Sequence, residues 1–284
     1  MSDQPALTPH ETILTGPSGL RLFTRSWKPP HPPRAIVAIC HGVNSHSGQY
    51  LWAGAELAKA GFAVHALDLR GRGKSDGERF YVDSIDEYVA DLSTLIAHAK
   101  AENPGLPLYL LGHSAGGVVS CTYTLDHQAE LAGLICESFA FRVFAPDLAL
   151  TLMKGLSHVI PHTGVLKLKF DDFSRDPAAV AAMYADPLIE GEAQPVATVA
   201  ALTRADERLE RDFPKITLPV FILHGTADHT TRPEGSQLFF EKAGSTDKTL
   251  KLYEGHFHDL LNDLGKEQVV ADIIGWINTR HAGR

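Results

Sequence analysis

Residues 107–117 read PLYLLGHSAGG, and this stretch decides the fold. The five apolar residues at its start predict a buried strand, and the helical pattern of residues 115–127 follows almost directly. The Gly112-His113-Ser114-Ala115-Gly116 segment between them fits GxSxG, a sharp strand-to-helix turn that exposes a serine hydroxyl as a nucleophile. Glycines are required in so sharp a turn because a side chain would collide with the neighbouring backbone. The stretch therefore predicts an α/β protein with Ser114 as its nucleophile.

Further apolar runs on both sides of this turn alternate with helical patterns, which is typical of repeated βαβ units. The predicted strands cover residues 20–27, 35–40, 62–69, 107–111, 133–136, 218–223 and 249–253. The predicted helices cover residues 50–60, 84–101, 115–127, 233–243 and 265–280. Because crossovers between parallel strands are right-handed, we expect a mostly parallel sheet with helices on both faces. Loops at the carboxyl ends of its strands are then free for chemistry.

The alternation stops between residues 140 and 213, where helical patterns occur without a convincing strand. We interpret this interval as a helical cap inserted into a core formed by residues 1–139 and 214–284. Its many apolar residues exceed what a solvent-facing excursion tolerates, so we predict that the cap encloses a lipophilic pocket. An amphipathic cap helix would also permit transient contact with a membrane surface, although packing on the core explains the same pattern.

Composition limits the partners of this chain. Its 284 residues carry a formal net charge of −8 with a pI near 6.0, which excludes the basic surface that nucleic acid requires. Cys40, Cys121 and Cys136 form no paired framework and are interpreted as reduced, buried thiols. The sequence shows neither a secretory signal at its start nor the ~18 uninterrupted apolar residues that span a bilayer, so we predict a cytoplasmic location.

A serine nucleophile on such a turn is followed in the chain first by an acid and then by a histidine, each just beyond a strand end. Asp228 follows the predicted strand 218–223 and is the expected orienting acid. Glu137, directly after the strand 133–136, is a rival from another strand end. Their order along the chain thus favours Asp228 but leaves Glu137 as an alternative.

Two histidines, His256 and His258, follow the last predicted strand, and their spacing does not choose between them as the base. The base accepts the proton of the serine and donates its other N–H to the acid, whereas the second histidine needs only a backbone partner. His224 and His229 lie beside the predicted acid and are interpreted as loop or surface residues.

The loop after the strand 35–40 contributes further candidates. The backbone N–H of Val43 in this loop and that of Ala115 after the nucleophile are the expected donors of an oxyanion hole. His41 and His46 are five residues apart, without carboxylate or cysteine support. Hydrogen-bonded loop histidines explain them better than a metal site, and we predict no metal in the active site.

Taken together, these segments resemble the monoacylglycerol lipase and lysophospholipase branch of the α/β-hydrolases. The matching segments are His41-Gly42, Ser47-Gly48-Gln49-Tyr50, residues 68–77 (DLRGRGKSDG), residues 112–117, Ser174-Arg175-Asp176-Pro177, Asp186-Pro187-Leu188, His224-Gly225 with Asp228, and residues 253–262 (YEGHFHDLLN). The resemblance implies the α/β-hydrolase fold with a helical cap, no cofactor, and the N–H groups of Val43 and Ala115 as the oxyanion hole. It also makes His258, rather than His256, the base.

The sequence departs from the pattern of this branch at two positions. Ser45 stands where relatives commonly carry an acidic residue, and Ala115 replaces the usual methionine after the nucleophile. Both are expected near the wall that binds the acyl chain, so they bear on substrate preference and not on the catalytic residues.

The predicted activity is a two-step acyl transfer from a lipid ester, most simply a monoacylglycerol or a medium-chain ester, to Ser114 and then to water. A lysophospholipase is the runner-up, with Arg142, Lys154 and Lys167 as candidate phosphate ligands. Hydrolysis of small esters or thioesters uses the same residues. A small-molecule receptor with this fold and little turnover is the alternative outside enzymes.

Overall fold

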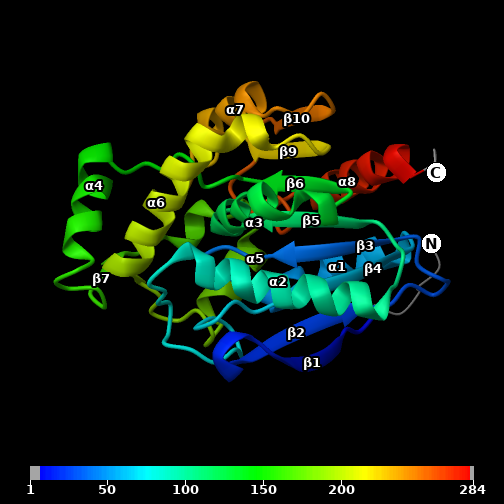
Figure 1. Cartoon of the computed structure of the whole chain (residues 1–284), viewed down its shortest axis with the longest axis horizontal. Helices are drawn as coiled ribbons and strands as arrows, with labels where there is room; N and C mark the ends of the chain where they lie inside the picture. Colours follow the sequence, from blue (N-terminus) through cyan, green and yellow to red (C-terminus); the bar gives the residue numbers. More distant parts are fainter. Residues whose placement is uncertain (1–6, 282–284) are drawn as a thin grey trace.

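The computed structural model describes residues 7–281, and a single eight-stranded sheet forms its centre (Figure 1). The strands are β1 (His10–Thr15), β2 (Arg21–Trp27), β3 (Ala35–Cys40), β4 (Phe62–Leu67), β5 (Leu108–His113), β6 (Gly133–Glu137), β9 (Val220–Gly225) and β10 (Lys248–Tyr253). Their order across the sheet is β1-β2-β4-β3-β5-β6-β9-β10. β2 runs antiparallel to both of its neighbours, and every pair from β4 to β10 is parallel. The prediction of a mostly parallel sheet is confirmed.

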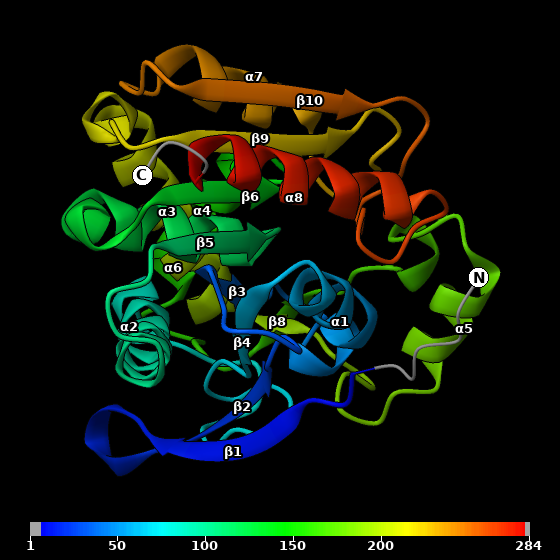
Figure 2. The same ribbon diagram turned by 90° about the vertical axis from the view of Figure 1, so that its right-hand side faces the viewer.

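Helices cover both faces of this sheet (Figure 2). The helices are α1 (Leu51–Lys59), α2 (Ile85–Glu102), α3 (Ala115–His127), α4 (Asp147–Leu156), α5 (Pro177–Tyr184), α6 (Val196–Asp212), α7 (Pro233–Lys242) and α8 (Lys266–His281). Short 3-10 helices are η1 (Pro17–Gly19), η2 (Ser47–Tyr50), η3 (Gln128–Glu130), η4 (Phe170–Asp172) and η5 (Phe213–Lys215). α1 and α8 pack on one face, and α2, α3, α6 and α7 pack on the other. The five helices predicted from the sequence thus all form, within about a residue of their expected ends.

Alternate residues of the central strands enter the two halves of the core. On β3, Ile36 and Ala38 join the cluster under α2 and α3, whereas Val37 and Ile39 join the cluster under α1 and α8. All six residues of this strand are buried, which is why it reads as a continuous apolar run. The three cysteines are free and buried, as expected. Within residues 7–281, no helix combines the length and the apolar character that crossing a bilayer requires.

Two features of the sheet structure were not foreseen. The prediction omits β1, which is an edge strand without a buried residue and therefore lacks the apolar face that marks a strand in the sequence. The expectation that residues 140–213 contain no strand is wrong, because β7 (Gly164–Leu166) pairs antiparallel with β8 (Gln194–Pro195). These strands are only two and three residues long, and β7 is exposed, so neither shows an alternating apolar pattern.

The interval 140–213 is packed very unevenly. Figure 1 shows α4 and β7 projecting beyond the carboxyl ends of the strands, with α6 running from them back to the sheet. None of the side chains described between residues 142 and 172 is buried. By contrast, Ala201, Ala205 and Leu209 on the inner face of α6 belong to the core under α3. α6 therefore connects an exposed outer layer to the main body of the protein.

Candidate active site

Ser114 lies between β5 and α3 with a backbone φ of 55° and ψ of −123°, a conformation that a residue with a side chain rarely adopts. Its N–H donates to the carbonyl oxygen of Glu137 at 2.9 Å, which fixes the turn to the neighbouring strand β6. A Cβ placed on Gly116 would lie 2.2 Å from the carbonyl oxygen of Cys40, and one on Gly42 would lie 2.8 Å from Cβ of Ser114. The glycines on both sides of the turn are thus required by close packing, as expected for a strand-to-helix turn that presents a nucleophile.

Asp228 and His258 meet beyond the ends of β9 and β10. Nδ1 of His258 lies 2.7 Å from Oδ2 of Asp228, and both side chains are fully buried. The backbone N–H groups of Thr230 and Thr231 donate to the other carboxylate oxygen at 2.7 and 2.9 Å. Nε2 of His258 is buried and has no hydrogen-bond partner among the described residues. With Asp228 accepting the proton on Nδ1, this second ring nitrogen is available to accept one from a hydroxyl group.

The surroundings of Asp228 determine its charge. Burial by itself would raise the pKa of this carboxyl, but His258 and His224, together with their hydrogen bonds, hold the pKa well below its usual range. The acid therefore stays ionised at neutral pH in a buried site. An ionised carboxylate is what keeps the imidazole in the required tautomer and stabilises it once it is protonated.

His224 was interpreted as a loop or surface residue, and this interpretation is wrong. It is the fifth residue of β9 and is fully buried, with Nε2 3.1 Å from Oδ2 of Asp228. Its other ring nitrogen lies 2.7 Å from the hydroxyl of Ser236 on α7. Sequence reasoning missed it because a histidine directly after an apolar run looks like the first residue of a loop. His224 is a second positioning partner of the acid.

Glu137, the alternative acid, and His256, the alternative base, have different surroundings from those of Asp228 and His258. The carboxyl of Glu137 accepts from the N–H of Leu261 at 3.3 Å, and its other oxygen has no hydrogen-bond partner among residues 7–281. Burial, followed by the neighbouring Asp259, raises the pKa of Glu137 well above its usual range. His256 is partly exposed, with Nδ1 3.6 Å from Asp263. Of these candidates, the structure brings only Asp228 and His258 together as a hydrogen-bonded pair.

The ring nitrogens of His41 and His46 form hydrogen bonds within the loops around the strand ends. Nε2 of His41 accepts from the N–H of Leu69 at 3.0 Å, and Nδ1 lies 2.7 Å from the carbonyl oxygen of Gly42. Burial lowers the pKa of His41 to about 4, so the ring is neutral. His46 contacts Asp186 through Nε2 at 2.7 Å and accepts from a loop N–H through Nδ1. Both are the hydrogen-bonded loop histidines that the sequence predicts.

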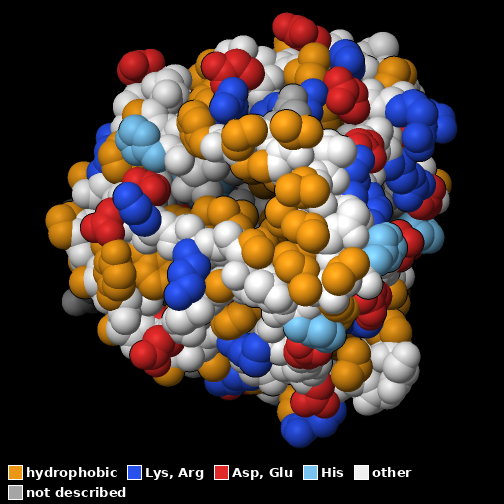
Figure 3. Space-filling model, turned by 90° about the vertical axis from the view of Figure 1, so that its left-hand side faces the viewer, with side chains coloured by type: hydrophobic (Ala, Val, Ile, Leu, Met, Phe, Trp, Pro, Cys, Tyr) orange, Lys and Arg blue, Asp and Glu red, His pale blue; other side chains and the backbone are white. Residues whose placement is uncertain are grey.

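A cavity of 280 Å³ opens beside the nucleophile. Ser114, Val43 and Ala115 form its floor, and Figure 3 shows hydrophobic side chains gathered around a hollow on this face of the molecule. Most of the remaining wall comes from the interval 140–213. Its apolar residues there include Val143, Phe144, Leu150, Leu166, Val199 and Leu202. The cavity is therefore shaped to take an apolar group up to the serine.

Val43 and Ala115, whose backbone N–H groups are the expected oxyanion-hole donors, line the cavity together with Ser114. Ala115 is the first residue of α3, so its N–H has no acceptor within the helix. Val43 lies in the loop that follows β3, and the adjacent Gly42 approaches so closely that a Cβ there would lie 3.2 Å from the nitrogen of Ala115. The positive end of the helix dipole adds to the local preference for negative charge. Ser45, expected near the acyl-binding wall, is buried and is not among the residues that line this cavity.

Asp206 of α6 is a cavity residue that sequence reasoning did not identify. Burial raises the pKa of its carboxyl well above the usual range, and its Oδ1 has no hydrogen-bond partner among the described residues. The raised pKa favours the protonated form of this carboxyl, which can donate a hydrogen bond. α6 contains many charged residues, and nothing in the sequence distinguishes the one that lines a cavity from the others.

The chain matches the family described as "Serine aminopeptidase, S33" over residues 31–265. The chain belongs to the S33 family. It is 33% identical to a monoglyceride lipase of Homo sapiens, over 98% of this chain and 94% of that protein. It is 31% identical to a monoacylglycerol lipase of Mycolicibacterium smegmatis, over 95% of this chain and 97% of that protein. These relatives confirm the resemblance drawn from the sequence motifs.

A solved structure agrees with this membership of the S33 family. The monoacylglycerol lipase of Paleococcus ferrophilus superposes with a TM-score of 0.82 at 30% identity, covering 91% of this chain and 99% of that one. The chain therefore has the predicted α/β-hydrolase fold.

Proposed function

We propose that this S33 family member hydrolyses monoacylglycerols or other medium-chain acyl esters through an acyl-enzyme on Ser114. The chain is a carboxylic ester hydrolase, in keeping with its lipase relatives. The observation that carries the finer proposal is the buried pair of Asp228 and His258, 2.7 Å apart, with the second ring nitrogen of the histidine unpaired within the described part of the chain. A serine on a strained turn at the floor of an apolar cavity supplies the remaining group.

In this proposal, His258 takes the proton of Ser114 through Nε2 as the hydroxyl attacks the ester carbonyl. The protonated ring then gives that proton to the departing alcohol, and the same ring activates the water that releases the fatty acid. Asp228 remains ionised throughout and stabilises the positive charge on the ring. The second partner of Asp228, His224, keeps the carboxylate oriented while the ring of His258 changes charge.

The developing negative charge on the ester oxygen would be held by the N–H groups of Val43 and Ala115. Both residues line the cavity together with the serine, and Ala115 begins a helix. Fixed donors in a site that excludes water need no reorganisation during the reaction, and losing one such donor typically costs about 3 kcal/mol of barrier.

The size and lining of the cavity support an ester with a single acyl chain. Its 280 Å³ is near the lower end of about 300–1,000 Å³ that small-molecule sites occupy. Burying an alkyl chain against the apolar wall is worth about 0.8 kcal/mol for each methylene group. We therefore expect catalytic efficiency to rise with chain length until the chain fills the cavity.

Residues 140–213 act as the cap in this proposal, and the core consists of residues 1–139 and 214–284. Phe144, Leu148, Leu152 and Val159 are between 55% and 81% exposed on the outer layer of this interval. Such an apolar surface beside the cavity suits transient contact with a membrane, from which a lipid ester could enter directly. The cytoplasmic location stays a prediction outside this proposal.

A lysophospholipid is the alternative substrate. The candidate phosphate ligands differ in whether they are already paired with an acid and whether they line the cavity. Arg142 pairs with Glu210 at 3.1 Å, and Lys154 pairs with Glu207, so both cations already have partners. Lys167 does line the cavity, and Lys169 lies there too. The alternative thus depends on these two lysines, and Lys167→Ala should impair a lysophospholipid substrate more than a monoacylglycerol.

The test compares Ser114→Ala with Ser93→Ala, which removes a hydroxyl from α2 far from the cavity. We expect Ser114→Ala to lose esterase activity almost completely and Ser93→Ala to keep it, measured on p-nitrophenyl esters from C2 to C10 and on a monoacylglycerol. Wild-type activity in Ser114→Ala would refute the mechanism. Efficiency that falls from C2 to C10 would refute the lipid substrate and favour a small ester.

Labelling by a fluorophosphonate separates an enzyme from a receptor with the same fold, because the probe reacts only with an activated serine. We expect stoichiometric labelling of the wild-type chain and none of Ser114→Ala. Tight binding of a lipid without labelling would favour the receptor.

A further inference from the structure

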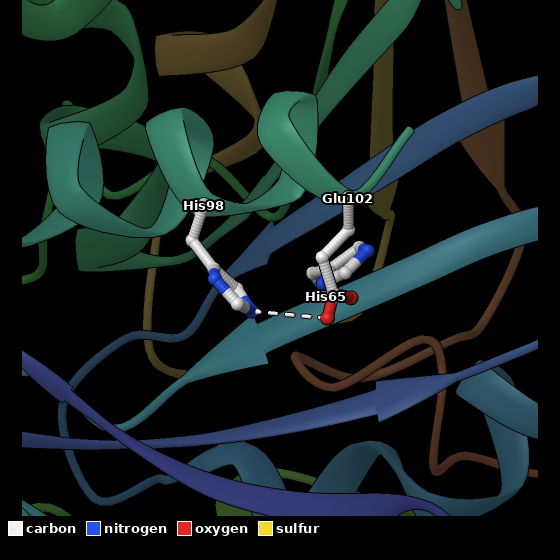
Figure 4. A group of neighbouring side chains, drawn as sticks. All are labelled: His65, His98 and Glu102. Carbon is white, nitrogen blue, oxygen red and sulfur yellow. Dashed lines mark ion pairs between the residues drawn. The ribbon is translucent and has the colours of Figure 1, made fainter. Parts of the chain in front are cut away.

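His65, His98 and Glu102 form a cluster of potential metal ligands remote from the proposed active site (Figure 4). His65 lies on β4, and the other two lie one turn apart at the end of α2. Figure 1 shows that α2 ends on the side of the molecule opposite the arrowheads of the parallel strands. The cluster therefore takes no part in the chemistry of Ser114, and a separate explanation is needed for two imidazoles and a carboxylate at this point.

The geometry of the three side chains is close to that of a coordination site. One ligand atom from each of them lies within 4.8 Å of the other two, and Nε2 of His98 lies 3.8 Å from Oε1 of Glu102. Ligand atoms bound tetrahedrally to one zinc ion at 2.0–2.1 Å lie about 3.4 Å from one another. The side chains of His98 and Glu102 are 29% and 36% exposed, so they have room to rotate towards a shared ion.

We propose that His65, His98 and Glu102 bind a divalent transition-metal ion of the zinc class. Two imidazole nitrogens with one carboxylate oxygen suit zinc and its neighbours, whereas magnesium and calcium prefer oxygen ligands alone. The buried His65 supplies a fixed ligand from the sheet, and the exposed pair allows the ion to enter from solvent. A water molecule would complete the tetrahedron, as at other sites with three protein ligands.

The bound ion would fasten the last turn of α2 to the middle of β4. Asn103, which follows this turn, also contacts His65, with its Nδ2 3.3 Å from Nε2 of the ring. If that nitrogen binds the metal, the amide must give way, and it retains its hydrogen bond to the carbonyl oxygen of Ala99 at 3.0 Å. Since the folded chain alone holds all three ligands together, binding should stabilise the fold by mass action.

The experiment uses the full-length chain without a histidine tag, freed of metal by a chelator, and titrated with Zn²⁺ in a calorimeter and in thermal melts. The variants are His98→Ala and Glu102→Gln. The matched control is His127→Ala, because His127 forms a comparable exposed pair with Glu130 at 3.3 Å but belongs to no group of three ligands among the described residues.

We expect the wild-type chain and His127→Ala to bind one more equivalent of Zn²⁺ than His98→Ala does. A Zn²⁺ concentration about ten times the Kd should raise their Tm by about 2–4 °C. His98→Ala should lose this rise, and Glu102→Gln should weaken binding at least about tenfold, as expected for loss of a charged ligand. Equal binding and an equal rise in Tm in His98→Ala and wild type would overturn the proposal, and so would no binding by the wild-type chain.

Discussion

The ends of the adjacent strands β6 and β9 each carry a buried carboxylic acid, and the two acids are in opposite states. Asp228, beyond β9, receives two backbone N–H groups and contacts two histidines, which keep its pKa low. Burial and the neighbouring acid Asp259 raise the pKa of Glu137, the last residue of β6, whose carboxyl receives a long hydrogen bond from the N–H of Leu261. Burial is common to both. The comparison shows that the donors around a buried acid, rather than burial itself, decide whether it is charged.

The largest effect is expected from replacing His258, the histidine proposed as the base, for which Asp228 and Glu137 are the alternative acids. His258→Ala should lower kcat about 10⁶-fold, as loss of the base does in a serine hydrolase. His256→Ala should change kcat only a fewfold, because this ring is partly exposed and its nearest acid, Asp263, is 3.6 Å away. Esterase kinetics on both purified variants measure the difference. A larger loss in His256→Ala would reverse the choice of base.

Neutralising the two acids in turn should have the next largest effect. Asp228→Asn should reduce kcat about 10⁴-fold, because an amide no longer fixes the tautomer of His258. Glu137→Gln should keep kcat within about threefold of wild type, since the raised pKa of Glu137 favours the uncharged acid, which the amide resembles. An equal loss of activity in both variants would contradict the claim that Asp228, and not Glu137, is the acid required for activity.

Truncating Glu137 should affect folding more than chemistry. Glu137→Ala leaves the N–H of Leu261 without its acceptor and opens a cavity under the loop that carries His258. We expect a loss of about 2–4 kcal/mol in the free energy of unfolding, measured with urea. Glu137→Gln serves as the control because its amide oxygen can accept the same hydrogen bond. Equal stability of the two variants would show that the hydrogen bond and packing are unimportant.

The smallest effect, taken per pH unit, is the dependence of stability on pH. Because the pKa of Glu137 is higher in the folded state than its ordinary 4.5, its contribution to stability is fully present below about pH 4.5 and is lost as pH rises towards the folded pKa. The stability of Glu137→Gln relative to wild type should therefore increase from pH 5 to pH 8, by at most about 1.4 kcal/mol per pH unit. Asp228, whose folded pKa is depressed, behaves in the opposite sense: its contribution to stability is fully present above its ordinary pKa and is lost only as pH falls below that value. Urea unfolding of both chains at several pH values measures this, and a constant difference would contradict it.

The sequence predicted the elements whose signals are local. In the sequence, glycines mark the turn at Ser114. Six successive apolar residues, all of them buried in the fold, mark β3. Asp228 was identified because acids of this kind follow a strand end. The choice of His258 over His256 needed the resemblance to a family, since both histidines follow the same strand and only the path of the folded loop separates them.

The features that the sequence did not reveal depend on contacts between distant segments. The burial of His224 follows from packing against Ser236 and Asp228, which no pattern along β9 announces. The raised pKa of Glu137 arises from its burial and from Asp259, more than a hundred residues away in the chain. β7 and β8 are too short and too exposed to show a period of two.

The uneven packing of the interval 140–213 determines how the substrate cavity can deform. One wall is the inner part of α6, which is embedded among the helices of the main body and is costly to displace. Another part of the wall comes from residues 143 to 169, a segment without a described buried side chain, and its helix α4 packs chiefly against α6. Local opening is cheapest where few apolar contacts must be broken. The cavity should therefore open by movement of α4 while α6 stays in place. Amide hydrogens of α4 should then exchange with solvent sooner than those of α6.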